Sequence, residues 1–155
     1  MINFANGDIF DYVQKDDVVL HQVNCKGVMG GGIAYQIKNM FPNVYQTYND
    51  YCKKHDYNCL SDFLPVKTKL DSISFIIGNC FGQNGFGKGL QTNYDALKNC
   101  FEQTKLLFPH NRILIPHSIG CGLAGGDWNI VFKMIENVFA DCEVLIVKYN
   151  IKIVK

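Results

Sequence analysis

One short stretch of the chain combines residues that suit ligand chemistry. An apolar run, residues 18–20, leads into His21 and Asn24, and three consecutive glycines follow at positions 30–32. A helix is predicted to begin at Ile33, and a glycine loop at a helix start offers unpaired N–H groups and the positive end of the helix dipole. The stretch therefore predicts a phosphate site built from backbone, beside an imidazole suited to proton transfer and an amide suited to hydroxyl groups.

Each of these residues also has a plainer interpretation. The glycine loop matches neither common nucleotide-binding fingerprint, so it could be a tight turn whose glycines serve packing alone. A lone histidine in a strand is more often a buried core residue than a catalyst, and a lone asparagine at a strand end is more often a turn former.

A second glycine loop, residues 118–126, follows a predicted strand at 112–116 and precedes Asp127 at the start of a helix. If the two strands before the glycine loops are neighbours, the loops close on one cleft from two sides, which suits a ligand with a central diphosphate. Asp8 follows the first predicted strand, and its carboxylate could accept hydrogen bonds from a ligand. Both carboxylates could instead cap the helix or turn that follows them.

Apolar periodicity predicts strands alternating with helices, which is the pattern of an α/β fold with a mostly parallel sheet and helices on both faces. Pro65 places its strand at an edge or makes it irregular. Thr92 is the predicted cap of the third helix. The predicted strands are 2–5, 18–25, 63–69, 73–81, 112–116 and 142–149, with a possible edge at 151–153, and the predicted helices are 33–40, 44–54, 92–108 and one opened by Asp127.

Length and composition limit the functional classes. The chain has 155 residues, 48% of them apolar and 19% charged, which fits one globular domain. A net charge of +1 without a Lys/Arg run gives no signal for nucleic acid. No segment has the roughly 18 apolar residues of a membrane span, and the start of the chain lacks the features of a signal peptide. We expect a monomer with no membrane partner.

Seven cysteines without a Cys-x-x-Cys pair indicate reduced thiols and a cytoplasmic location. Cys25 and Cys121 lie in the two glycine loops but lack the Cys-x5-Arg arrangement of cysteine phosphatases, so we interpret them as packing residues. The four histidines are not spaced as metal ligands, and no carboxylate pair lies near the glycine loops. We therefore expect no metal and no cofactor.

Three segments together resemble the macro-domain family: residues 6–10, Asn24 with residues 30–34, and residues 119–128. The resemblance implies a single three-layer α/β/α macro domain over residues 1–155, with ADP-ribose or a derivative as its ligand. In the family, the first segment binds adenine, and the other two bind ribose and phosphate. The implied ligand-binding residues are Asp8, Ile9, Asn24, Gly30, Gly31, Gly32, Ile33, Ser118, Gly120, Cys121, Gly122 and Leu123.

Within the family, the stretch from His21 to residue 36 is most similar to the ADP-ribose-1''-phosphate phosphatase branch. That branch implies His21 and Asp127 as catalytic residues, with His21 donating a proton and Asp127 orienting water, and no metal. A related branch removes ADP-ribose from protein carboxylates or DNA, using a lysine and an aspartate. Here Ala124 stands where that aspartate should lie, and Lys88 is only approximately placed for the lysine. The alternatives to a phosphatase are an ADP-ribosyl hydrolase and a module that binds ADP-ribose or its conjugates.

Overall fold

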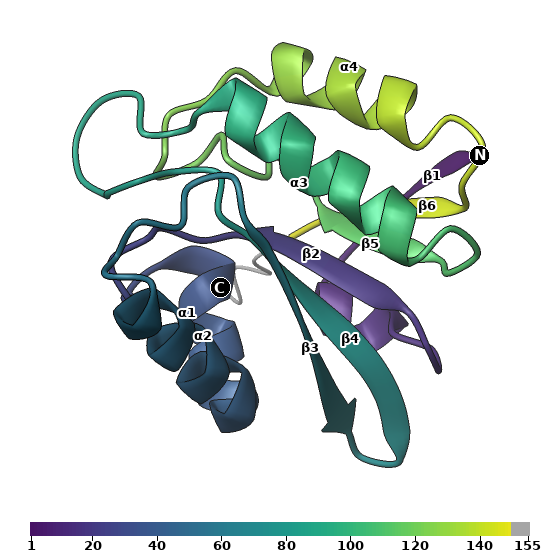
Figure 1. The fold of residues 1–155 in the computed structure, drawn as a ribbon. Helices are drawn as coiled ribbons and strands as arrows, with labels where there is room; N and C mark the ends of the chain where they lie inside the picture. The colour runs from purple at the N-terminus through teal and green to yellow at the C-terminus, as the bar shows by residue number, and fades with distance from the viewer. Residues whose placement is uncertain (150–155) are drawn as a thin grey trace, which may run out of the picture.

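The computed structural model describes residues 1–149, in which six strands form one sheet in the order β1-β6-β5-β2-β4-β3 (Figure 1). All neighbouring strands run parallel except β3 and β4, so the predicted mixed, mostly parallel sheet is confirmed. The strands are β1 (Ile2–Asn6), β2 (Val18–Gln22), β3 (Phe63–Leu70), β4 (Ile73–Cys80), β5 (Ile113–Pro116) and β6 (Val144–Lys148).

Helices cover both faces of this sheet, which confirms the predicted three-layer α/β/α arrangement. Helices α1 (Gly32–Met40) and α2 (Pro42–Lys54) lie on one face, and α3 (Tyr94–Leu107) and α4 (Trp128–Val138) lie on the other (Figure 1). A short 3₁₀ helix, η1 (Ile9–Tyr12), follows β1.

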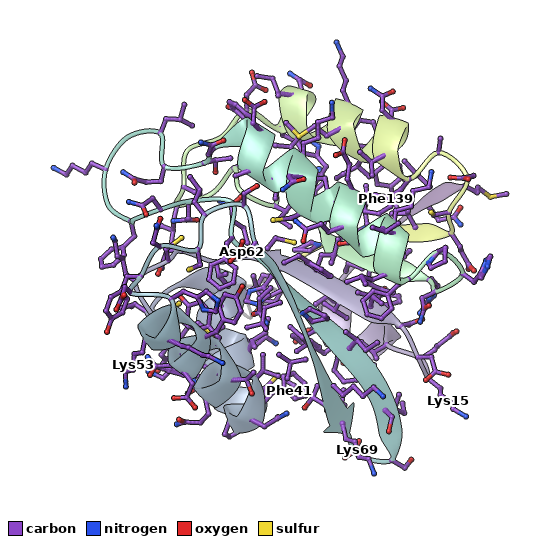
Figure 2. All side chains as sticks on the ribbon, in the orientation of Figure 1. Lys15, Phe41, Lys53, Asp62, Lys69 and Phe139 are labelled. Carbon is purple, nitrogen blue, oxygen red and sulfur yellow. The ribbon has the colours of Figure 1, made fainter. Side chains whose placement is uncertain are left out.

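The central strands are apolar on both sides because both of their faces are covered. Alternate residues of β2 enter opposite cores: Val18 and Leu20 pack with the α3–α4 layer, and Val19 packs with the α1–α2 layer. Figure 2 shows the same division, with Phe41 and Phe139 on opposite sides of the sheet. The same alternation determines on which face of the sheet each side chain of β2 lies.

The structure corrects two predicted boundaries. Strand β2 ends at Gln22, not at residue 25, because the Asn24 side-chain oxygen accepts the Lys26 N–H at 2.9 Å and turns the chain. Helix α3 is capped by Asn93, whose side chain accepts the Ala96 N–H, and the Thr92 hydroxyl instead donates to the Gly120 carbonyl. The predicted edge strand at 151–153 lies outside the described residues.

The fold also shows which strand lies at an edge of the sheet and whether any described helix could span a membrane. Strand β3, which contains Pro65, lies at one edge of the sheet, as predicted. Within residues 1–149, none of the helices combines the length and the apolarity that a membrane span requires.

Candidate functional site

A cleft of about 1050 Å³ opens beyond the carboxyl ends of β1, β6, β5 and β2. This is the edge at which parallel α/β sheets bind ligands. Most of the predicted ligand-binding residues line it: Asp8, Ile9, Asn24, Gly30, Gly31, Gly32, Ile33, Ser118, Gly120, Gly122 and Leu123. Segments from three distant parts of the chain therefore meet in one cavity.

The first glycine loop ends at the start of α1. Gly31 is the N-cap residue of α1, with φ −148° and ψ 161°, and it supplies no side-chain hydrogen bond. The N–H groups of the first helical turn have no partner within the helix. With no side chain to cap them, these donors face the cleft at the positive end of the helix dipole, where an anion is stabilised.

The second glycine loop is held in shape by its own backbone. The Cys121 N–H donates to the Ser118 carbonyl at 2.8 Å, and the Gly126 N–H donates to the Gly120 carbonyl at 2.9 Å. Gly120 has φ +72°, and a Cβ atom there would lie 2.8 Å from Gln22 Oε1. Glycine is required at this position both for the left-handed backbone and for the close approach of Gln22.

The two loops approach each other across the cleft because β2 and β5 are neighbouring parallel strands. A Cβ atom on Gly31 would lie 2.6 Å from Leu123 Cδ1, and Leu123 itself is 81% exposed. The conditional prediction that both loops close on one cleft is therefore confirmed.

Asp8 both caps η1 and lines the cleft. Its Oδ1 accepts the Phe10 N–H at 2.9 Å, and its Oδ2 accepts a hydrogen bond from Gln36 Nε2 at 2.8 Å. Each carboxylate oxygen can accept a further bond, so capping and ligand binding are compatible.

Asn24 forms a turn directly after β2, which is one of the two roles expected from the sequence. Its amide nitrogen donates to the Val28 carbonyl at 2.8 Å, and its side-chain oxygen accepts from Lys26 N–H and from the Tyr48 hydroxyl, both at 2.9 Å. Only one N–H of its amide is left for a ligand. The main effect of Asn24 on the cleft is to hold the first glycine loop in place.

His21, which the family resemblance implies as catalytic, is not among the residues that line the cleft. It is fully buried beneath the α1–α2 layer, and its Nε2 donates to Asn79 Oδ1 at 2.6 Å. Asn79 Nδ2 in turn donates to the Leu64 carbonyl, which fixes the orientation of the amide. Burial lowers the pKa of His21 to about 4, against the opposing effect of the Asn79 bond, so the buried imidazole is neutral at pH 7 and its Nε2–H is used by Asn79.

Asp127 and Cys121 also lie outside the cleft lining. Asp127 is the N-cap of α4, with its Oδ1 accepting the Asn129 N–H at 2.9 Å, as the capping alternative proposed. Burial, with the nearby charge of Asp127, raises the pKa of the Cys121 thiol to about 11. A protonated thiol is a poor nucleophile, which supports the interpretation of Cys121 as a packing residue.

Several cleft residues were not predicted. Gln22, at the end of β2, donates from Nε2 to Gln83 Oε1 and to the Thr92 hydroxyl, both at 2.9 Å. The loop joining β4 to α3 stands away from the sheet (Figure 1) and places Phe86 and Lys88 on the cleft. Within residues 1–149, Lys88 is the one lining residue with a Lys or Arg side chain. Its position in a glycine-rich loop after a strong strand was the available signal.

Within residues 1–149, no group of three His, Cys, Asp or Glu side chains is arranged to hold a metal ion.

The Macro domain family model matches residues 20–135. An ADP-ribose 1''-phosphate phosphatase of Meyerozyma guilliermondii is 38% identical over 58 residues, which are 37% of this chain and 33% of that protein. A DNA ADP-ribosyl glycohydrolase of Mycobacterium tuberculosis is 32% identical over 77 residues, 50% of this chain and 21% of that protein. The aligned parts thus span at most about a third of either relative.

Among solved structures, the macrodomain of Mycobacterium tuberculosis DarG has a similar fold. It superimposes with a TM-score of 0.78 at 24% identity, covering 98% of this chain and 99% of that one. This likeness concerns the arrangement of the elements over nearly the whole chain.

The buried state of His21 predicts a specific dependence of stability on pH. The unfolded chain binds a proton at His21 below about pH 6.5, whereas the folded protein does not until about pH 4. The free energy of unfolding therefore falls as the pH is lowered through this window, by about 3 kcal/mol in total from this group. In His21→Gln, which keeps an amide donor for Asn79, this component should be absent. Urea unfolding of both proteins from pH 7 to pH 4 measures it, and parallel curves would contradict the buried, neutral imidazole.

The capping role of Asp127 predicts a loss of stability in Asp127→Ala of ~1 kcal/mol. Asp127→Asn should remain near the wild type, because asparagine is an equally good N-cap residue. Thermal and urea unfolding of the three proteins measure the difference. A wild-type stability in Asp127→Ala would mean that the observed bond to the Asn129 N–H does not stabilise α4.

Proposed function

The chain belongs to the macro-domain family, and on that premise we propose that its cleft binds ADP-ribose and that the protein hydrolyses ADP-ribose 1''-phosphate to ADP-ribose and phosphate. The observation that carries the proposal is the meeting of two glycine loops, at Gly31 and Leu123, across the middle of one cleft. A diphosphate between them would accept hydrogen bonds from backbone N–H groups on both sides.

The strand order supports a direction for the ligand. Asp8 and Ile9 follow β1 at one end of the cleft, and the loop with Lys88 follows β4, on the far side of β2. Adenine bound at Asp8 would therefore leave the second ribose and its phosphate near Lys88. The diphosphate falls between these ends, where the glycine loops are closest.

Phosphate removal requires stabilised phosphoryl charge, a water in line with the breaking P–O bond, and a proton for the leaving sugar oxygen. Neither His21 nor Asp127 lines the cleft, and His21 is fully buried. We therefore assign the charge-stabilising role to Lys88, an ammonium group at the proposed phosphate end, together with the loop amides. Similarity over part of the chain to an ADP-ribose 1''-phosphate phosphatase supports the reaction.

Two assays on purified protein test the proposal together. Calorimetry with ADP-ribose measures binding, and malachite-green detection of phosphate released from ADP-ribose 1''-phosphate measures turnover. Heat with ADP-ribose and release of phosphate would support both parts. Binding without turnover would make the protein a module that binds ADP-ribose or its conjugates. The absence of binding at millimolar ADP-ribose would contradict the proposal as a whole.

Release of ADP-ribose from an acceptor is a second candidate reaction. The observation that favours it is the position of Lys88 on the cleft, together with the partial similarity to a DNA ADP-ribosyl glycohydrolase. If Lys88 acted in such a reaction by forming a covalent adduct between its amine and the sugar, arginine could not replace it. The identity of residue 88 therefore separates the two reactions.

Gly31→Glu should weaken ADP-ribose binding by roughly 100-fold or more, because a carboxylate there would repel the diphosphate. The backbone of Gly31 is in a region open to all residues, and the contact of a new Cβ is with the exposed, flexible end of Leu123, so the fold should be retained. Gly31→Ala, which adds bulk without charge, is the matched control and should lose much less affinity. Calorimetry measures both, and circular dichroism checks the fold. Wild-type affinity in Gly31→Glu would mean that this loop does not hold phosphate.

Lys88→Ala should lower phosphate release from ADP-ribose 1''-phosphate by roughly 10²-fold, as the loss of a charge-stabilising group does. Lys88→Arg should retain most of the activity, because arginine keeps the charge and can donate to phosphate oxygens. Full activity in Lys88→Ala would exclude Lys88 from the reaction. Loss of activity in both variants, with cleavage of an ADP-ribosylated acceptor by the wild type, would favour the adduct-forming hydrolase.

A further inference from the structure

Gln36 is a side chain of the cleft for which the proposed function has no role. It lies on α1, less than two turns after the first glycine loop, and it lines the cleft beside Asp8. We propose that Gln36 is a positioning residue that holds the Asp8 carboxylate as an acceptor for the base and so makes the cleft select adenine over other purines. This inference rests on the proposed function, because it concerns how the same cleft reads the base of its ligand.

The contacts of Asp8 show how the carboxylate is fixed. The Phe10 N–H occupies one direction on Oδ1 at 2.9 Å, and the Gln36 amide occupies one direction on Oδ2 at 2.8 Å. The donors come from different elements, η1 and α1, so they hold the plane of the carboxylate between them. The torsion that orients a carboxylate is intrinsically broad, and a single donor would leave it free to turn. The remaining acceptor positions therefore point in defined directions only while Gln36 donates.

A backbone donor lies next to this acceptor. The Ile9 N–H begins η1, and within residues 1–149 it has no hydrogen-bond acceptor. Ile9 also lines the cleft, adjacent in the chain to Asp8. An acceptor and a donor therefore stand side by side at one end of the cavity.

This acceptor–donor pair is complementary to adenine. Adenine presents an amino donor at position 6 and a bare acceptor nitrogen at position 1. Hypoxanthine presents an acceptor oxygen at position 6 and an N–H at position 1. Asp8 and Ile9 would thus form two hydrogen bonds with adenine, and would place acceptor against acceptor and donor against donor with hypoxanthine. Polar mismatches of this kind discriminate strongly, because they leave desolvated groups unpaired.

A glutamine suits the positioning task because its amide donates a hydrogen bond without bringing a charge. A glutamate at position 36 would repel Asp8 and favour a shared proton, which would turn one carboxylate into a donor and reverse the pattern that adenine requires. A methionine would keep the length and helix propensity of the side chain but would remove the donor. A lysine would keep a donor within reach of Asp8. These substitutions separate the hydrogen bond from the bulk of the side chain.

The experiment compares calorimetric affinities for ADP-ribose and for its hypoxanthine analogue, inosine diphosphate ribose. Four proteins are needed: wild type, Gln36→Met, Gln36→Lys and Gln46→Met. Gln46 is exposed on α2 and lies outside the cleft, so its substitution controls for a Gln-to-Met change on a helix. The quantity compared is the ratio of the two affinities, because a general loss of folded protein would lower both affinities and leave their ratio unchanged.

We expect the wild type to prefer ADP-ribose and Gln36→Met to lose about tenfold of that preference. Gln36→Lys and Gln46→Met should keep it. An unchanged ratio in Gln36→Met, with ADP-ribose still bound, would overturn the role of Gln36 and leave the proposed function intact. Equal binding of the two ligands by the wild type would overturn base selection at Asp8. If the wild type bound neither ligand, the proposed function would fail and this inference with it.

Discussion

The site depends on one constraint, the parallel pairing of β2 with β5. In that register Val18 lies opposite Ile113 and Val19 lies opposite Leu114, so the two strands end at the same edge of the sheet. Each strand is followed by a glycine loop, and the loops meet because their strands are adjacent. Backbone N–H groups from residues about ninety positions apart in the chain therefore face the same cleft. Neither loop could form this cleft alone.

A residue type suited to catalysis does not by itself place a side chain at the site, because the position of the residue in the sheet decides whether the side chain is buried. Residues in the middle of a doubly covered sheet are removed from solvent whatever their chemistry. His21 is therefore satisfied internally, through Asn79 to the Leu64 carbonyl, and burial keeps the pKa of its imidazole near 4. Gln22, one residue further along β2, points to the opposite side and lies at the strand end, so its amide joins the cleft wall to Gln83 and Thr92. A shift of one position along a strand changes a buried core residue into a cleft residue.

Much of the fold was predictable from the sequence because its signals are local. Apolar runs marked the strands, Pro65 marked an edge strand, and glycine clusters marked the loops at the strand ends. Strand order and the facing of side chains were not predictable in this way, because they depend on which strands pair. The Asn24 side chain ended β2 earlier than its apolar pattern indicated.

The residues that line the cleft were predictable mainly where a glycine cluster or an acidic residue directly follows a strand. The glycine loops and Asp8 line the cleft, whereas His21 and Asp127, which the family resemblance implies as catalytic, lie outside its lining. Gln36 donates a hydrogen bond to Asp8, which lies 28 positions away in the chain, and no local sequence pattern predicts such a bond. Long-range hydrogen bonds of this kind require the folded arrangement before they can be recognised.

The most direct test of the account is a titration of ¹⁵N-labelled protein with ADP-ribose, followed by the chemical shifts of the backbone amides. We predict that the largest changes occur in the two glycine loops, residues 30–34 and 120–124, and at Ile9, while the amide of His21 changes little. Saturable changes confined to other surfaces, or none at millimolar ADP-ribose, would contradict a ligand held between the two loops.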